Sequence, residues 1–292
     1  MKLLITGANG FVGRNLAQQY AERHEVAAPG RAELDLMDAD AVRSYLERGR
    51  FDAILHAATY RSTRLTGSAP DLLNANCRMF FNLTRNAHAF GRVLFLSSGA
   101  VYDREHWHPR MAEEEFDTHV PADAYGFSKY ICAKAVDGLE RVYEFRLFGA
   151  FGPHEDWRVR FISNACARAV WNLPLVIRQN VCFDYMDVAD LGRLLEPMLT
   201  RELSHRHYNL CTGRAMELRA LAAMVVAASG KRLDIEIKNA GLGNEYSGTN
   251  ARLLAELPDF RFTAMEDSIA SLYRWYEARK GEIDPALLRF DG

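Results

Sequence analysis

The sequence lacks the features that would direct a protein to a membrane or to a nucleic acid. Its 292 residues contain no apolar stretch close to the roughly 20 residues that span a bilayer. The formal net charge is only -2, and no run of like charges occurs. We therefore expect neither a membrane nor a nucleic acid as a partner. The hydrophobic fraction of 49% and the charged fraction of 25% are instead typical of a soluble globular chain.

Cysteine is also scarce, and the cysteines that occur are scattered. No two of the five form a CxxC pair; they are Cys77, Cys132, Cys166, Cys182 and Cys211. This spacing argues against disulfides and a zinc site and predicts a reducing compartment, by default the cytoplasm. The histidines of the HWHP and HRH stretches have no carboxylate or cysteine at ligand spacing, so we expect no metal.

What the sequence does contain is a regular alternation of two patterns over its first two thirds. Short apolar runs typical of buried strands occupy residues 3–6, 25–28, 53–56, 93–97 and 143–147. Helical patterns lie between them, at residues 12–23, 39–48, 71–90 and 123–139. Strands that alternate with helices predict an α/β fold, in which helices cover both faces of a parallel sheet.

Beyond about residue 152 this alternation breaks. Residues 161–171 and 218–229 have helical patterns, and residues 233–237 have the pattern of a strand. A final amphipathic helix is predicted over residues 265–280. Because neither an internal repeat nor a low-complexity linker sets these segments apart, we expect any second domain to be interwoven with the first.

Three glycines spaced three apart follow the first apolar run, in the stretch TGANGFVG. Gly7, Gly10 and Gly13 stand between the first predicted strand and the first predicted helix, where backbone N–H groups and the helix dipole favour an anion. Side chains at Gly7 or Gly10 would hold a diphosphate away from these donors. The spacing is GxxGxxG instead of GxGxxG, and a merely structural turn is the alternative. The residues expected to bind a dinucleotide are Gly7, Asn9, Gly10, Phe11, Val12 and Gly13.

The end of the second predicted strand bears on which dinucleotide binds. An NAD site usually places an acidic residue there for the ribose 2′-hydroxyl, whereas an NADP site prefers a cation for the 2′-phosphate. The first acidic residue, Glu33, comes late, while Arg31 can pair with a phosphate through two N–H groups. We favour NADP(H) over NAD(H); the alternative is that Arg31 is a solvated loop residue. Arg14 is a second candidate cation, and Asp35 or Asp38 either reaches the adenine or caps the next helix.

Two further stretches, RVLFLSSGAVYD and DAYGFSKYICAK, carry candidate proton-transfer groups. Ser97 and Ser98 end a predicted buried strand, where a hydroxyl can hydrogen-bond a substrate oxygen. Tyr125 and Lys129 are four residues apart on a predicted helix and therefore share one face. A nearby ammonium and an oxidised nicotinamide both favour a phenolate. Lowering the pKa of a phenol from about 10 to about 7 requires roughly 4 kcal/mol of such stabilisation.

Together these motifs identify a resemblance to the extended short-chain dehydrogenases/reductases that act on nucleotide-sugars. The resemblance runs over nearly the whole length, through TGANGFVG, DAILHAAT, LFLSSGAVY, YGFSK, RLFGAFGP and FDYMDVADL. It implies a Rossmann-type doubly wound parallel sheet with a smaller, interwoven C-terminal substrate-binding α/β domain. The dinucleotide-binding domain would comprise residues 1–155 and about 178–205. The substrate domain would comprise about 156–177 and 206–292.

The resemblance also implies roles for single residues. Ser98, Tyr125 and Lys129 would form the catalytic triad, and Lys129 would also bind the nicotinamide ribose. The spacing of the family favours Ser98 over Ser97, and both stay open. Asn76 would support the site from its helix. The residues that would pass under the cofactor are Ala57, Ala58 and Thr59.

Departures from the family pattern narrow the expected activity. The dehydratases carry an acidic pair after the catalytic hydroxyl, but Gly99 and Ala100 follow Ser98 here. Enzymes resembling GDP-fucose synthase use a cysteine where this chain has Ala100. What remains is an NADP(H)-dependent reduction of a 4-keto nucleotide-sugar at C4, with Tyr125 as the proton donor. The alternatives are a nucleotide-sugar 4-epimerase with tightly bound NAD and a non-catalytic dinucleotide-binding sensor or scaffold.

The substrate side is expected around GPHEDWRVRFISNACARA, where the family lays its nucleotide diphosphate. For Arg158, Arg160 and Asn164 the alternative is a solvated helix start, and for Asp184 it is edge-strand packing. Helices over about 73–90 and 124–139 carry apolar positions on more than one face, which predicts a homodimer, or else a well-buried helix in a monomer. The residues expected to bind substrate are Ser98, Gly99, Ala100, Arg158, Arg160, Asn164, Arg178 and Asp184.

Overall fold

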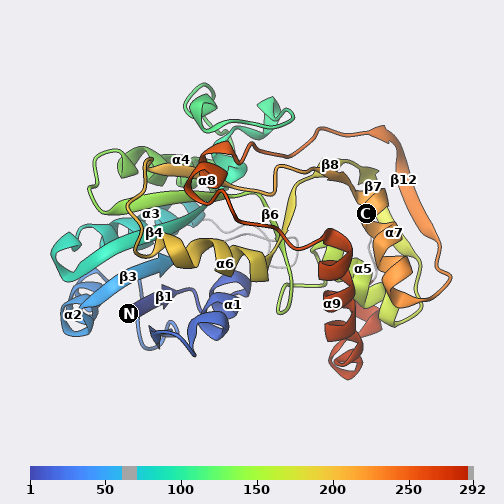
Figure 1. Ribbon diagram of the computed structural model, residues 1–292, viewed down its shortest axis with the longest axis horizontal. Coiled ribbons are helices and arrows are strands. Elements are labelled where there is room, and N and C mark those ends of the chain that lie inside the picture. The colour runs from blue at the N-terminus through green and yellow to red at the C-terminus, as the bar shows by residue number, and fades with distance from the viewer. Residues whose placement is uncertain (61–70, 289–292) are drawn as a thin grey trace.

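A six-stranded parallel sheet forms the centre of the larger part of the molecule (Figure 1). The computed structural model describes residues 1–60 and 71–288. The strand order is β10-β5-β4-β3-β1-β2, and each pairing is parallel. The strands are β1 (Lys2–Thr6), β2 (Glu25–Ala27), β3 (Phe51–His56), β4 (Phe90–Ser98), β5 (Val142–Leu147) and β10 (His207–Leu210). The first five match the predicted strands and confirm the α/β fold.

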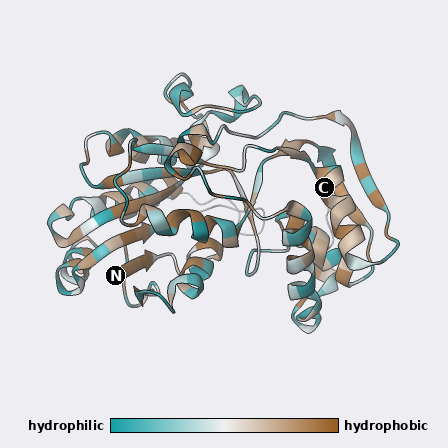
Figure 2. Cartoon of the chain, in the orientation of Figure 1, coloured by the Kyte–Doolittle hydropathy of each residue, from teal (hydrophilic) through white to brown (hydrophobic). Residues whose placement is uncertain are grey.

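Helices cover both faces of this sheet. One face packs against α1 (Phe11–Tyr20) and α6 (Val188–Met198) in a common apolar core. The other face packs against α2 (Ala39–Gly49), α3 (Leu72–Thr84) and α4 (Ala124–Val136). In Figure 2 the hydrophobic residues concentrate on the strands between these layers. This two-sided cover is the Rossmann-type doubly wound arrangement.

α3 is shorter than its predicted counterpart over residues 71–90. It ends at Thr84, and a 3-10 turn over Ala87–Ala89 precedes β4. The backbone of Asn86 has φ -101° and ψ 38°, which is not helical, and the Asn86 side-chain amide donates to the Asn82 backbone carbonyl at 2.8 Å. Asparagine competes with the helical backbone in this way and ends the regular winding.

The smaller part of the molecule, at the right of Figure 1, is built from three helices and a strand pair. α5 (Phe161–Val170), α7 (Leu218–Ser229) and α9 (Met265–Glu277) share an apolar core. β7 (Leu175–Asn180) and β12 (Ile235–Leu242) pair in parallel beside them. The three helices match the patterns predicted near the C-terminal third of the chain.

Short elements connect the two parts. β6 (Gly149–Phe151) pairs with β9 (Tyr185–Asp187), and β8 (Cys182–Phe183) pairs with β11 (Met216–Glu217). α8 (Ala251–Glu256) packs against β10. No helix within residues 1–60 and 71–288 is both long and apolar enough to cross a membrane.

The strand pairing assigns two segments differently from the predicted domain boundaries. β7 lies across the expected boundary at residues 177–178, and it pairs with β12 of the smaller part. β10 lies beyond the expected boundary at about 205, yet it pairs with β5 of the central sheet. Tyr208 and Leu210 are fully buried there and complete the apolar core of the larger part. The division into two domains stays a prediction, but these pairings place β7 with the smaller part and β10 with the larger part.

Candidate active site

The turn between β1 and α1 comes into backbone contact with the end of β3. Gly7 has φ +73°, and a Cβ there would lie 2.7 Å from the Cα of Ala58. A Cβ at Gly13 would lie 2.4 Å from the carbonyl oxygen of Gly7. Side chains do not fit at either distance, so both positions require glycine. The glycines therefore allow the turn, α1 and the β3 edge to approach one another.

The start of α1 is open to solvent. Gly10 occupies the N-cap with extended backbone and no side-chain hydrogen bond, and the first turn contains no acidic residue. Asn9 and Gly10 are exposed, while Phe11 and Val12 are half-buried. The N–H groups and the positive end of the helix dipole are left for an outside anion, a geometry that suits a diphosphate.

The loop after β3 is tied to α4 through one asparagine of α3. Asn76 accepts a hydrogen bond from the Tyr60 amide at 2.7 Å and donates to the Tyr60 carbonyl at 3.1 Å. Its amide also donates to the Ser128 hydroxyl on α4 at 3.2 Å. The Thr59 hydroxyl, next to Tyr60, donates to Asn76 Oδ1 at 3.5 Å. The segment over residues 57–59 is thus fixed between the glycine turn and α4.

Tyr125 and Lys129 lie one helical turn apart on one face of α4. Asp123 caps α4 by accepting from the Tyr125 amide at 3.1 Å and the Gly126 amide at 3.0 Å. Lys129 is buried, and its Nζ lies 5.0 Å from the ring centre of Phe95 and 5.8 Å from that of Tyr125. The predicted proximity of the phenol and the ammonium is therefore present.

His56 lies at the end of β3, near Lys129, and sequence reasoning missed it. Burial, followed by the charge of Lys129, lowers the pKa of His56 to about 3. The ring is therefore neutral, and its Nδ1 lies 2.8 Å from the Thr6 hydroxyl. The stretch DAILHAAT contained this histidine, but nothing local marked it as a neighbour of Lys129.

Ser98 and Ser97 point to different surroundings at the end of β4. The Ser98 hydroxyl accepts from the Ala100 amide at 3.2 Å and caps a short 3-10 turn over Gly99–Val101. A Cβ at Gly126 would lie 2.7 Å from the Ala100 carbonyl, so this turn packs directly on the start of α4. Ser97 instead lies in register with Arg146 of β5, and its buried hydroxyl has no hydrogen-bond partner among the described residues. The geometry favours Ser98 as the hydroxyl near Tyr125.

Three aromatic side chains, Tyr246, Phe148 and Trp107, pack beside the turn after Ser98. A Cβ at Gly99 would lie 2.5 Å from the Tyr246 hydroxyl and 3.0 Å from the Phe148 ring. The Tyr246 ring centre lies 4.1 Å from that of Trp107 and 4.9 Å from that of Phe148. Sequence reasoning missed Tyr246, because no local signal connects residue 246 with residue 99.

The candidate cations near the cofactor turn lie at the surface. The Arg31 side chain is 77% exposed, and its guanidinium lies 3.5 Å from Asp35. Arg14 is exposed in the first turn of α1. Asp38 caps α2 by accepting from the Asp40 and Ala41 amides, which settles its role in favour of the capping alternative.

The residues predicted on the substrate side lie in several environments. Arg158 is exposed and forms two hydrogen bonds with Asp156, at 2.7 and 2.8 Å. Arg160 is half-buried at the N-cap of α5, while Arg178 is exposed on β7. Asn164 is buried and donates to the Trp157 carbonyl at 3.0 Å. The structure does not bring these four residues together with Ser98 as a single cluster of free side chains.

Asp184 is completely buried and holds a turn of the chain. Its carboxylate accepts from the Thr212 amide and hydroxyl and from the Gly213 amide, at 2.7 to 2.8 Å, and from the Arg214 amide at 3.2 Å. Burial raises the pKa of Asp184, and these donors act against that shift. These hydrogen bonds give Asp184 a structural role in fixing the turn at residues 212–214, which agrees with the packing alternative and not with substrate binding.

Three of the four histidines in HWHP and HRH have carboxylate partners, contrary to expectation. His106 Nδ1 lies 2.7 Å from Asp103, and His108 Nε2 lies 2.5 Å from Glu115. His207 lies between two carboxylates that are distant in the sequence. Among the described residues, no three such side chains converge in the manner of metal ligands.

The sequence matches known proteins over most of its length. Residues 3–211 match the model of the "NAD dependent epimerase/dehydratase family". The chain is 28% identical over 193 residues to an ADP-L-glycero-D-manno-heptose-6-epimerase of Cupriavidus pinatubonensis, which covers 57% of this chain and 56% of that protein. It is 22% identical over 292 aligned residues to a GDP-6-deoxy-D-talose 4-dehydrogenase of Aggregatibacter actinomycetemcomitans, which covers 94% of this chain and 97% of that protein.

The fold also matches solved structures. One of them is a GDP-L-fucose synthetase from Naegleria fowleri bound to NADP, with a TM-score of 0.81 and 18% sequence identity. The match covers 96% of this chain and 95% of that chain. At this identity the likeness concerns the fold, including both the central sheet and the smaller part.

Proposed function

The chain belongs to the NAD dependent epimerase/dehydratase family, and from this premise we propose that it is an NADP(H)-dependent reductase of a 4-keto nucleotide-sugar. The coarser activity follows from the family and the relatives: an NAD(P)-dependent nucleotide-sugar enzyme of the extended short-chain dehydrogenase/reductase type. One observation carries the finer proposal. The turn capped by Ser98 packs directly on the start of α4, the helix that holds Tyr125 and Lys129.

The turn between β1 and α1 fits a nicotinamide dinucleotide. Gly7 and Gly13 let the turn, the end of β3 and α1 pack closely together, and the open start of α1 favours a diphosphate. When bound, the cofactor supplies the hydride for the carbonyl carbon. The ion pair of Arg31 with Asp35 is exposed and therefore weak, so the guanidinium is available to a 2′-phosphate. This availability supports NADP over NAD.

Tyr125 is the proposed donor of the proton to the substrate oxygen. Lys129 follows one helical turn later, and its charge favours the phenolate that remains after transfer. The Ser98 oxygen accepts from the Ala100 amide, so the Ser98 hydroxyl hydrogen can be donated to the same substrate oxygen. Two donors on one oxygen stabilise the negative charge that develops there during reduction.

Two observations favour reduction over elimination and over epimerisation that depends on a cysteine. Gly99 and Ala100 offer no carboxylate or thiol after Ser98, and the Tyr246 hydroxyl leaves no room for a side chain at Gly99. The relative from Aggregatibacter, named for dehydrogenation at C4, covers 94% of this chain. Dehydrogenation and reduction are two directions of one hydride transfer. A nucleotide-sugar epimerase with retained NAD is the second candidate, supported by the epimerase from Cupriavidus.

A homodimer through α3 and α4 stays part of the proposal. Phe81 on α3 is 40% exposed, although phenylalanine is usually buried. Phe80 beside it is fully buried in the core, so α3 has apolar residues on two faces. Sedimentation of the purified protein measures this state directly, and a monomer at high concentration would exclude it.

A panel of nucleotide-linked 4-keto-sugars tests the activity. The purified protein is mixed with GDP-, dTDP-, UDP- or CDP-linked 4-keto-hexoses, and the loss of NADPH absorbance is followed. We expect turnover with at least one member, and little with NADH. The bound cofactor is also extracted from the purified protein. Copurified NAD together with interconversion of C4 epimers, and no net use of NADPH, would replace the reductase by the epimerase.

A further inference from the structure

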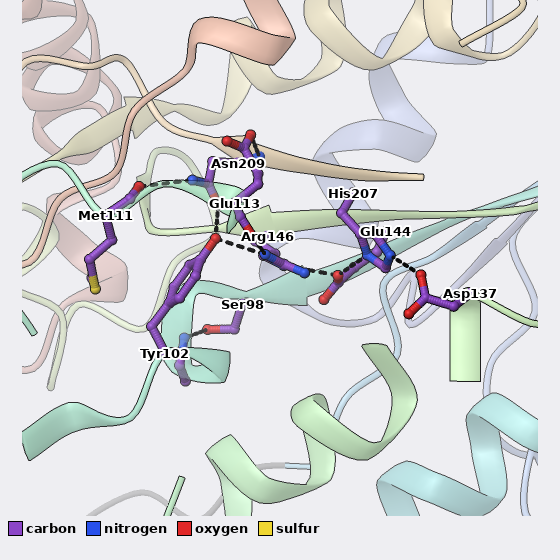
Figure 3. Close-up of polar contacts among 10 residues, drawn as sticks. Ser98, Tyr102, Met111, Glu113, Asp137, Glu144, Arg146, His207 and Asn209 are labelled. Atoms are coloured by element: carbon purple, nitrogen blue, oxygen red, sulfur yellow. Dashed lines mark hydrogen bonds and ion pairs between the residues drawn. The ribbon is translucent and has the colours of Figure 1, made fainter. Parts of the chain in front are cut away.

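Three neighbouring strands carry polar side chains on one face of the sheet, beneath α4. Arg146 of β5 is in register with Ser97 of β4 and Asn209 of β10. Two residues earlier, Glu144 of β5 is in register with His207 of β10. Figure 3 shows His207, Glu144 and Arg146 within a continuous chain of contacts that reaches from Asp137 to Tyr102. Apolar residues would be the usual occupants of such a buried face.

His207 is the link between this buried row and the surface. Its Nδ1 lies 2.7 Å from Glu144 Oε2, and its Nε2 lies 2.8 Å from Asp137 Oδ1 at the end of α4. A neutral imidazole has one N–H, whereas an imidazolium has two. Because both partners are carboxylates, only the imidazolium can donate to both at once. The ring of Phe116 also lies near His207, and the two ring centres are 6.2 Å apart.

Glu144 and Arg146 form a fully buried ion pair. Arg146 Nε donates to Glu144 Oε2 at 2.9 Å, and both side chains are at most 1% exposed. Burial acts against the charge on Glu144, but Arg146 and His207 outweigh it and lower the pKa of this carboxyl. A buried pair of charges loses its water and is therefore weak evidence for a role in stability alone. Its position suggests a role in geometry.

The far end of the chain of contacts fixes the residue that follows the Ser98 turn. Arg146 donates to the Tyr102 hydroxyl at 2.8 Å, and Tyr102 donates to Asn209 Oδ1 at 2.8 Å. The Tyr102 amide donates to the Gly99 carbonyl at 3.1 Å and closes the 3-10 turn that Ser98 caps. Tyr102 thus holds the turn from one side, and Ser98 holds it from the other.

We propose that Glu144 and His207 are positioning residues for Ser98. His207 orients the Glu144 carboxylate, Glu144 orients Arg146, and Arg146 fixes Tyr102 and with it the Ser98 turn. The inference rests on the proposed function, because it gives Ser98 a place at the substrate oxygen. It adds a specific part of the chain to that function: a row of charges that reaches the surface at Asp137, the residue just after α4.

The test compares His207→Gln with His205→Gln in the full-length protein. His205 lies on the same stretch and is exposed, so its replacement controls for loss of a histidine. We expect kcat for 4-keto-sugar reduction to fall about tenfold in His207→Gln, with KM for NADPH nearly unchanged, because a displaced hydroxyl slows the chemical step. In a Ser98→Ala background, His207→Gln should cause no further loss. An equal further loss there, or equal kcat in the two glutamine variants, would overturn the proposal.

A second readout does not depend on activity. Exchange of the Ala100 amide, which donates to Ser98, should be faster in His207→Gln than in His205→Gln, while the amides of β1 exchange alike in both. Glu144→Gln serves in the same way if His207→Gln does not fold. Unchanged exchange at Ala100 would refute the positioning role. If no nucleotide-sugar is turned over by the wild type, the proposed function fails, and the exchange measurement still decides the inference.

Discussion

Two regions of the candidate site are built in opposite ways. The turn between β1 and α1 depends on missing side chains, because Gly7 and Gly13 let backbone touch backbone. The row beneath α4 depends on charged side chains, such as Arg146, in the centre of a sheet. A glycine cluster is visible in the sequence, whereas a charged residue within a strand gives no local sign of its partner. Function can therefore be recognised from the first region more readily than from the second.

The largest expected effect comes from α4, the helix that carries Tyr125. Tyr125→Phe removes one hydroxyl and leaves both regions intact. The kcat for 4-keto-sugar reduction should fall by roughly 10²–10⁴, because general acid catalysis typically contributes that much. The affinity for NADPH, measured by fluorescence titration, should stay within about twofold, since the Tyr125 hydroxyl acts in the chemical step and not in binding the cofactor. Surviving turnover would show that another group donates the proton.

The buried row should be the more fragile region when one charge is removed. Arg146→Met leaves Glu144 buried without its main partner, so the free energy of unfolding should fall by about 3–5 kcal/mol. The pKa of Glu144 lies below its ordinary value of 4.5 in the native protein. The stabilising contribution of the pair is therefore complete above pH 4.5 and disappears as the pH falls through the native pKa.

Urea unfolding of wild type and Arg146→Met at several pH values measures this effect. The difference between the two proteins should narrow as the solution becomes more acidic. A difference that stays constant with pH would show that lost packing of Arg146 on Phe116, whose ring centre lies 4.4 Å from the guanidinium, explains the change.

The glycine turn should respond to an added methyl group. In Gly13→Ala the new Cβ would lie 2.4 Å from the Gly7 carbonyl oxygen, so the free energy of unfolding should fall by about 1–3 kcal/mol and dinucleotide binding should weaken. Gly281→Ala is the matched control, because a Cβ there meets nothing within 4 Å. Equal urea midpoints for the two variants would show that the close backbone approach is not needed.

A change at Arg31 separates cofactor choice from the turn itself. Arg31→Ala should raise KM for NADPH about tenfold, because a charge-assisted contact with a phosphate is lost. KM for NADH should not change, and neither should stability, since the side chain is 77% exposed. An equal effect on both cofactors would assign Arg31 to the diphosphate instead of the 2′-phosphate.

The smallest effect concerns the thiol of Cys77 on α3. The neighbouring thiol of Cys132 on α4, opposed by burial and assisted by the charge of Lys129, lowers the pKa of Cys77 to about 7. Iodoacetamide labelling of Cys77, followed by mass spectrometry, should therefore accelerate through about pH 7. Cys182, whose pKa is raised by burial, should react more slowly at the same pH. Faster labelling of Cys182 would contradict this ordering, and Cys77→Ser should leave kcat nearly unchanged.

The fold could be predicted from the sequence where a run of apolar residues indicates a buried strand. β1, β3 and β4 are apolar runs with little polar interruption, and their bounds match the predictions closely. α6 escaped prediction because it contains Gly192 and Pro197, which usually break helices. Gly192 packs against the Gln19 side chain of α1, because a Cβ there would lie 1.8 Å from the Gln19 amide oxygen. In β10, polar residues occupy every second position, because they face the buried row instead of an apolar layer.

The residues of the candidate site that could be predicted are those close together in the sequence. The glycine turn and the pair Tyr125 and Lys129 were predicted from residue spacing within a short segment, and folding does not change that spacing. The contact of Tyr246 with Gly99 and the hydrogen bond from Tyr102 to Asn209 join residues more than 100 positions apart. Such contacts depend on the order of strands in the sheet, which the sequence pattern did not specify.

The crowding around Gly99 constrains how this chain can diverge. An acidic residue at position 99, which water elimination by a relative would require, meets the Tyr246 hydroxyl at 2.5 Å. The Tyr246 ring packs against Trp107 and Phe148, so moving it would cost these contacts. A mutational path toward elimination therefore has an obligatory order: residue 246 must shrink first, and only then can a carboxylate be gained.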